Sequence, residues 1–267
     1  MRDELLRQLT RRRTRFVLAS MVVIPLLLAG IYVVRGAPKL APGDTPALAQ
    51  LADGSALAFA TYVLYLCAPL LLVAIGALFA GDSIASEASW GTLRYLLAAP
   101  VTRRGLLARK LGAALTLLAL ALVLLIGTSL AVGAIAFGWH ALDTPVGGVI
   151  AATPATWRLL LACAYVFVSI VPFAALALWF SVLVDAPLAS VAGSMGIAVV
   201  AQILDALPTL GRVRSALPTH YAYDWLDLYV DPPSGADMSA GVLQATLVSV
   251  FALAAAWWAF ARRDVAS

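Results

Sequence analysis

Six long apolar runs constrain what this chain can fold into more than any other feature of its sequence. They lie near residues 16–35, 57–80, 107–137, 158–183, 187–205 and 241–261. Charged side chains stand only at their borders, as at Asp82, Lys110 and Asp185. A helix of about 20 residues crosses the roughly 30 Å of a hydrocarbon layer. Because lipid offers the backbone no hydrogen bonds, we expect six transmembrane helices rather than strands.

The overall composition supports a membrane environment. Of the 267 residues, 63% are hydrophobic and only 12% are charged, whereas about a quarter of the residues of a soluble domain are charged. The arginine-rich start followed by an apolar run is also a feature of secretory signal peptides. The first run is longer than a signal core and five more follow, so we expect it to be retained as a helix. Pro25, Pro69 and Pro172 fall inside runs and are expected to kink them.

The positions of the basic residues predict the orientation in the membrane. Thirteen of the eighteen lysines and arginines lie in residues 2–15, 94–110 and 262–263. The other five, Arg35, Lys39, Arg158, Arg212 and Arg214, would lie on the opposite side. Basic loops favour the cytoplasm. The sequence therefore predicts an all-α, multi-pass protein of the cytoplasmic (plasma) membrane with both termini cytoplasmic.

Residues 1–15 are expected to form an amphipathic helix lying in the membrane interface, ahead of a six-helix transmembrane domain over 16–267. Leu5, Leu6 and Leu9 share one side of such a helix, and arginines cover the rest. A basic amphipathic helix binds an anionic lipid surface. It serves either as a simple topology anchor or as a lever that touches a cytoplasmic partner.

An external amphipathic segment is expected over about 206–240. Tyr221, Trp225, Leu228 and Tyr229 recur at helical spacing, and aspartates take the other side. Tyr and Trp favour the boundary between water and lipid. The segment, re-entrant or interfacial, is either an aromatic anchor or an external gate, with Tyr221, Trp225 and Tyr229 as the gate or interface residues.

Several kinds of chemistry find no support in the sequence. It contains neither a GxxxxGK[ST] phosphate loop nor an HExxH zinc motif. We therefore expect no catalytic, metal-binding or cofactor-binding residue in this chain, and so no enzyme. Gly193 and Gly196 around Ser194 are typical of close helix packing rather than of a nucleophile. The basic residues border apolar runs instead of forming one soluble face, which argues against nucleic acid as a partner.

The link over about 86–100 has the pattern of a short helix that docks into a soluble partner. Trp90, Leu93 and Leu97 fall on one stripe, and Glu87, Gly91 and Arg94 form a second. An apolar ridge beside a charged one suits insertion into a groove on another protein.

The pattern Glu87-x-x-x-Gly91-Thr92-Leu93-x-x-Leu96-Leu97-x-x-Pro100-x-x-Arg103, followed by Lys110, resembles the signature loop of type-2 permeases of ATP-binding cassette (ABC) transporters. The basic N-terminal helix, the six spans and the external segment before the last span fit the same family. One departure is that Ala88 and Ser89 replace a lysine or acidic residue often seen beside the family's glutamate.

The resemblance implies a division of labour. Two copies of a separate ABC ATPase would bind ATP and magnesium, and a second permease unit would pair with this one as a homodimer or heterodimer in the lipid bilayer. The coupling helix, seated in a cleft of the ATPase, would comprise Glu87, Trp90, Gly91, Thr92, Leu93, Arg94, Leu97, Pro100 and Arg103.

Three functions remain open on the sequence. The expected one is a transmembrane permease subunit of an ABC exporter. The second is a secondary transporter driven by an ion gradient, although such carriers usually place ionisable groups within their spans. The third is a membrane scaffold that transports nothing.

Overall fold

The computed structural model describes residues 2–39, 47–89, 103–144, 148–230 and 233–262. Nearly all of the described chain is helical, and six of its helical segments are long and apolar enough to cross a membrane, which confirms the expected fold class. They comprise α2 (Arg12–Arg35), the rod formed by α4 (Ala56–Cys67), η1 (Ala68–Leu72) and α5 (Val73–Ser89), α7 (Arg103–Phe137), α8 (Ala152–Leu183), α9 (Pro187–Asp205) and α10 (Ala236–Arg262).

The shorter elements lie at the ends of these spans. The helix α1 (Arg2–Leu9) precedes α2, and α3 (Leu48–Leu51) precedes α4. The strands β1 (Leu142–Asp143) and β2 (Val149–Ile150) pair antiparallel between α7 and α8. Two 3-10 helices, η2 (Pro208–Ala216) and η3 (Asp224–Tyr229), connect α9 to α10.

The second span changes its helical geometry at a proline. Pro69 is the second residue of η1, which is a π-helical turn. Proline lacks a backbone N–H and collides with the carbonyl one turn earlier, and at Pro69 the wider π-helical turn accommodates it. By contrast, α2 and α8 each continue as a single α-helix through Pro25 and Pro172.

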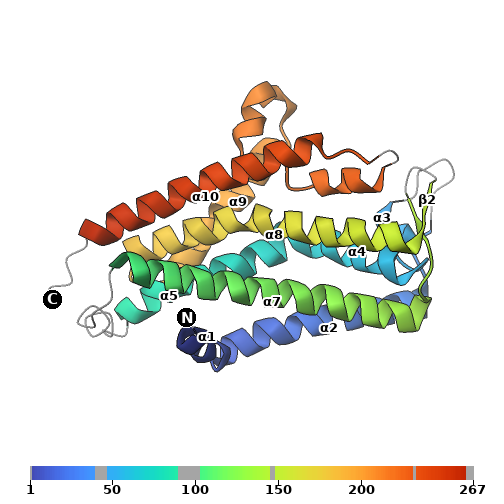
Figure 1. Ribbon diagram of the computed structural model, residues 1–267, viewed down its shortest axis with the longest axis horizontal. Helices are drawn as coiled ribbons and strands as arrows, with labels where there is room; N and C mark the ends of the chain where they lie inside the picture. The colour runs from blue at the N-terminus through green and yellow to red at the C-terminus, as the bar shows by residue number, and fades with distance from the viewer. Residues whose placement is uncertain (1, 40–46, 90–102, 145–147, 231–232, 263–267) are drawn as a thin grey trace.

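The bundle is built around α8. Both α5 and α10 pack along α8, α9 packs against α5 and α8, and α2 packs against α7 (Figure 1). Consequently α2, α9 and α10 bury only one side each. Their outer sides carry large apolar residues such as Phe16, which is 76% exposed, and Leu188, which is 81% exposed. Such surfaces are stable when hydrocarbon surrounds them.

The helix α1 and the last turns of α10 lie toward the end of the bundle where α5 ends and α7 begins (Figure 1). The β1–β2 hairpin lies at the opposite end, beside the start of α4. The end that carries α1 therefore also carries both borders of residues 90–102, which contain most of the coupling helix expected over about 86–100.

Candidate coupling site

Seven charged side chains meet at the α1 end of the bundle, and we call them the basal cluster. They come from α1, the α1–α2 corner, α5 and α7, and comprise Glu4, Arg7, Arg11, Arg13, Asp82, Glu87 and Lys110. The cluster ties the N-terminal helices to the last residues of α5 and the first turns of α7. Residues 90–102 connect those two helices.

The centre of the basal cluster is a buried ion pair. Lys110 Nζ lies 2.8 Å from Glu87 Oε1, and the two side chains are 2% and 1% exposed. Lys110 Nζ also donates a hydrogen bond of 2.6 Å to the backbone carbonyl of Ser83. A buried ammonium group is tolerated only when its donors meet such acceptors, because removing a charge from water costs several kcal/mol. The pair joins α5 to α7 directly.

The helix α1 is fastened to this pair from the other side. Arg7 forms an ion pair with Glu87 and also contacts both carboxylate oxygens of Glu4 at 3.0 Å. Lys110 Nζ lies 3.5 Å from Glu4 Oε1. Burial alone would raise the pKa of Glu4, but the positive charges of Lys110 and Arg7 outweigh burial and lower it. Glu4 is therefore ionised at neutral pH.

The apolar side of α1 is split between the bundle and the surroundings. Leu5 and Leu9 pack against the core, whereas Leu6 is 54% exposed. The structure thus gives α1 two attachments, leucine packing and ion pairs. Its proposed place in the membrane interface remains a prediction.

Asp82 fixes the corner between α1 and α2. It is 4% exposed and forms ion pairs with Arg11, which precedes α2, and with Arg13 in the first turn of α2. Two cations on one carboxylate hold the chain where it changes direction, and they join the end of α5 to the start of α2.

The site residues predicted from the sequence fall into three groups. Glu87 is described, and its side chain lies inside this chain rather than on its surface. Arg103 begins α7, but the structure does not describe its side chain. The other predicted residues lie outside the described part of the chain: Trp90, Gly91, Thr92, Leu93, Arg94, Leu97 and Pro100. Their contact with an ATPase therefore stays a prediction.

Sequence reasoning missed the basal cluster as a unit. It treated the N-terminal arginines as lipid-facing charges and Lys110 as a border residue. A signal was present, because Asp82 and Glu87 are the only acidic residues between Asp53 and Asp143. Two isolated carboxylates at the end of an apolar span need cationic partners, and basic residues are frequent on both sides of them in the sequence, over 7–15 and 94–110.

The external gate residues pack into the bundle. Trp225 is 0% and Tyr229 4% exposed. Thr61 of α4 donates a hydrogen bond of 3.2 Å to the Tyr229 hydroxyl, and Tyr165 of α8 donates one of 2.6 Å to the backbone carbonyl of Tyr221. The segment forms two 3-10 helices rather than one amphipathic α-helix. Its role as a gate remains a prediction.

A second set of charges holds the external segment to α9. Asp205, at the last turn of α9, lies 2.6 Å from His220 Nδ1 and 3.2 Å from Arg214 Nε. These contacts, together with those of Tyr221 and Tyr229, attach the segment to α4, α8 and α9 at once.

Neither metal chemistry nor a serine nucleophile is visible in the part of the chain that the structure describes. No group of three or more His, Cys, Asp or Glu residues there is arranged to hold a metal ion. Ser194 Oγ donates to the backbone carbonyl of Phe173 at 2.7 Å. A Cβ atom added to Gly193 would lie 3.0 Å from the Phe180 ring. These contacts are those of a packing motif.

Comparison with known proteins gives one family. The model of the ABC-2 family transporter proteins matches residues 10–201, from the α1–α2 corner to the last turns of α9. No curated protein matches the chain. The matched range contains five members of the basal cluster, Arg11, Arg13, Asp82, Glu87 and Lys110, and the whole link between α5 and α7.

Proposed function

This chain belongs to the ABC-2 family of transporter proteins and is a multi-pass ABC transporter permease; from that premise we propose that it exports its substrate using ATP hydrolysed by a separate ATPase chain. The observation that carries the proposal is the family match together with the position of the basal cluster at both ends of residues 90–102. The 267 residues contain no phosphate loop of their own. Two ATPase copies and a second permease unit would complete the transporter.

The basal cluster explains how movement of the ATPase would reach the membrane spans. The coupling helix expected over about 86–100 lies mostly within residues 90–102, which we call the coupling segment. This segment seats in the ATPase, with the side chains of Trp90, Leu93 and Arg94 among its contacts. Closure of the ATPase on ATP pushes this segment. Because Glu87 and Lys110 join the two helices that flank it, α5 and α7 move as one body rather than separately.

The movement then spreads by packing. The helix α5 lies along α8 and α9, and α7 lies along α2. The ion pairs of Arg7 and Arg11 carry α1 and the start of α2 with them. Arg7 and Arg11 thereby make α1 a lever. Its basic side rests on the anionic inner leaflet, with both chain termini in the cytoplasm.

A carrier driven by an ion gradient is less well supported. The acidic residues within the described spans Ala56–Glu87 and Gly105–Phe137 are Asp82 and Glu87, and both lie at one end in ion pairs. A proton relay needs ionisable groups along the path through the membrane. The described middle portions of these spans offer none.

The partner ATPase is tested by co-purification. The tagged chain, solubilised in mild detergent from its own cells, should carry a second chain with a GxxxxGK[ST] loop. Arg94→Glu should lower its recovery about tenfold or more, because a reversed charge in a docking site opposes association. Arg212→Glu, an exposed arginine of the external segment, should leave recovery unchanged. If the two variants recovered equal amounts of the ATPase, residue 94 would not be part of the interface with it.

Orientation and energy source are tested separately. A Gly91→Cys variant in whole cells should resist a membrane-impermeant thiol reagent, and an Arg212→Cys variant should react with it.

In liposomes that contain this chain and its partner ATPase, ATP should drive transport. Uphill transport by this chain alone on a proton or sodium gradient would contradict the proposal.

A further inference from the structure

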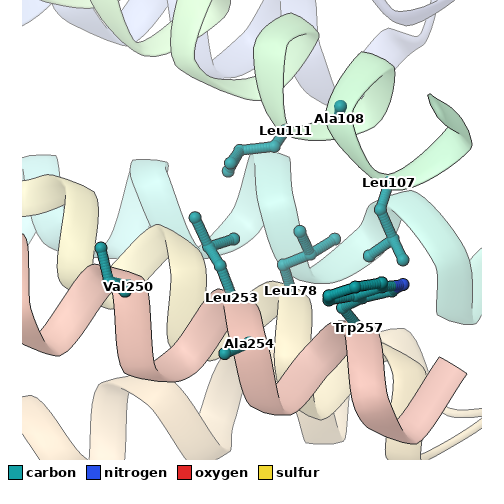
Figure 2. Close-up of a pocket in the computed structure, with 8 residues that line it drawn as sticks. All are labelled: Leu107, Ala108, Leu111, Leu178, Val250, Leu253, Ala254 and Trp257. Carbon is teal, nitrogen blue, oxygen red and sulfur yellow. The ribbon is translucent and has the colours of Figure 1, made fainter. Parts of the chain in front are cut away.

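Cavities of two kinds lie among the membrane spans. One is a groove between α7 and α10, and Figure 2 shows the leucine, alanine, valine and tryptophan side chains that line it. None of the described side-chain atoms that are buried without a hydrogen-bond partner belongs to this groove. The groove therefore sets no requirement for a polar occupant. A second cavity differs from it in this respect.

The second cavity lies between the π-helical turn η1, the helices α8 and α9, and the external segment. Pro69 comes from η1, Phe173 from α8, and Pro218 from the external segment. The volume of the cavity is about 20 Å³, far below the ~300–1,000 Å³ of pockets for organic ligands. One water molecule needs ~10–15 Å³. Size therefore limits the occupant to a water molecule or a small ion.

The cavity contains a buried hydroxyl group that lacks a partner. Three of its lining residues carry a polar side chain, namely Ser169, Gln202 and Thr219. Thr219 is 7% exposed, and its hydroxyl has no hydrogen-bond partner among the described residues. Ser169 Oγ donates to the backbone carbonyl of Tyr165 at 2.9 Å, so its lone pairs remain to accept a hydrogen bond. The Gln202 amide supplies donors and an acceptor. These are the groups that an ordered water molecule requires.

The wall formed by η1 is a second reason to expect water. Pro69 has no N–H, so it cannot donate to the carbonyl of Tyr65 as other residues do in an α-helix. In membrane helices, backbone groups freed by a proline are satisfied by neighbouring side chains and ordered waters. Pro69 and Thr219 line the same cavity. The backbone at this turn and the threonine hydroxyl therefore both favour a water molecule there.

The charge of the lining decides between water and an ion. None of the residues that line the cavity carries a charged side chain. An ion would be buried there without a counter-charge, which costs far more than burying a neutral molecule whose hydrogen bonds are made. Water is therefore the favoured occupant.

We propose that this cavity binds one ordered water molecule, hydrogen-bonded to the Thr219 hydroxyl, the Gln202 amide and Ser169 Oγ. The water joins the external segment to α8 and α9 beside the π-helical turn of the second span. This inference rests on the packing of the described residues and depends neither on the substrate nor on the ATPase.

Radiolytic footprinting tests the water directly. Synchrotron X-rays split water, and a bound molecule then hydroxylates the buried side chains beside it, which radicals from bulk solvent do not reach. Phe173 lines the cavity and is 2% exposed, whereas Phe59 is 0% exposed and lies outside the lining. In the purified chain in mild detergent, we expect hydroxylation of Phe173 and not of Phe59.

Variants of Thr219 show whether its hydroxyl holds the water. Thr219→Val keeps the shape but removes the hydroxyl, and it should lower the labelling of Phe173 about fivefold, the weight of one hydrogen bond. Thr219→Ser keeps the hydroxyl and should retain the labelling. Ser249→Ala is the matched control, because that buried hydroxyl donates to the carbonyl of Ala245 at 2.6 Å, away from the cavity. Thermal unfolding verifies that each variant is folded.

The bridge to Gln202 is tested by a double-variant cycle. Thr219→Val and Gln202→Met should each lower the midpoint of thermal unfolding, and the double variant should lose less than the sum, because the first change already releases the water. Labelling should be equal in sodium chloride and in choline chloride.

Four results would overturn the proposal. Phe173 of the unaltered chain might stay unlabelled, or Thr219→Val could label as strongly as Ser249→Ala. The losses of Thr219→Val and Gln202→Met could be additive. Labelling that required sodium would make the occupant an ion.

Discussion

The ammonium group of Lys110 and the carboxylate of Glu87 lie 2.8 Å apart with both side chains almost fully buried, which joins the end of α5 to the first turns of α7. The pair stands immediately beside residues 90–102. Its partners Arg7 and Glu4 extend it to α1. A joint of this kind can carry a push from the coupling segment only if its charges remain paired.

Breaking the central pair should destabilise the protein strongly. Lys110→Met or Glu87→Gln should each lower the free energy of unfolding by about 3–5 kcal/mol, because one charge stays buried without its main partner. The double variant should lose less than the sum of the two. Chemical unfolding in detergent measures all three.

Arg109→Met is the matched control for Lys110→Met. Arg109 is adjacent in sequence and exposed, so its replacement should change the free energy of unfolding by no more than about 0.5 kcal/mol. If the losses of the two buried variants were simply additive, the pair would carry no coupling energy, and the joint between α5 and α7 would have to be sought elsewhere.

The corner between α1 and α2 should loosen when Asp82 loses a cation. Arg11→Gln removes one of its two arginines, whereas Arg12→Gln changes the exposed neighbour. A hydrogen bond between charged groups contributes about 1.5–3 kcal/mol. Backbone amides of α1 should therefore exchange with deuterium roughly tenfold faster in Arg11→Gln than in the unaltered chain.

The same pair of variants distinguishes a lever from a plain anchor. If α1 transmits force, Arg11→Gln should also lower the ATP hydrolysis that this chain stimulates in its partner, while Arg12→Gln should not. If the amides of α1 exchanged faster in Arg11→Gln while ATP hydrolysis by the partner was still fully stimulated, α1 would be a topology anchor only.

The sequence was sufficient to place the six spans because one physical requirement dominates there. A segment that crosses lipid needs length and an almost complete lack of charge, and both are read locally. The ends of the spans were predicted less accurately. The fourth span begins at Ala152 rather than near residue 158, because Thr153, Pro154 and Thr156 are compatible with the first turns of a helix although they are not strongly apolar.

The basal cluster was beyond reach for a different reason. Arg7 and Glu87 are 80 residues apart, and Lys110 and Glu4 are 106 apart. Nothing in either local pattern specifies the partner. The external segment was predicted better than the basal cluster but less well than the spans. Its apolar spacing placed Trp225 and Tyr229 on the same side of the segment, but their contacts with α4 and α8 depend on how the spans pack.

Gly241 should prove intolerant of any side chain. A Cβ atom there would lie 2.1 Å from the Tyr165 hydroxyl and 2.7 Å from Tyr221 Cβ. Gly241→Ala should therefore push α10 from the external segment and cost about 1–3 kcal/mol, as overpacking does elsewhere. Tyr165→Phe removes the nearest atom, so adding it to Gly241→Ala should recover part of the loss, measured by thermal unfolding in detergent.

Gly196→Ala is the control for that substitution. Nothing lies within 4 Å of a Cβ atom placed on Gly196 in α9. Alanine should be neutral there or stabilise by up to about 1 kcal/mol, since glycine is the weaker helix former. Equal effects of the two alanines would show that helix propensity, not the contact between α10 and Tyr165, sets the outcome at Gly241.

The external segment should become less stable as the pH rises from about 4 to 6. Burial, and then the neighbouring carboxylates of Asp237 and Asp227, raise the pKa of Asp224 to about 6, while His220 opposes the rise. The folded protein therefore binds a proton at Asp224 more tightly than the unfolded chain, whose reference pKa is 3.8. Between these values the folded state holds the extra proton, so stability falls as pH rises through the window from about 4 to 6. Asp224→Asn cannot ionise and should remove this fall. Thermal unfolding at pH 4, 6 and 8 should show the variant more stable than the unaltered chain at pH 8, with the difference shrinking at pH 4; a constant difference across the three pH values would show that Asp224 does not titrate in this window.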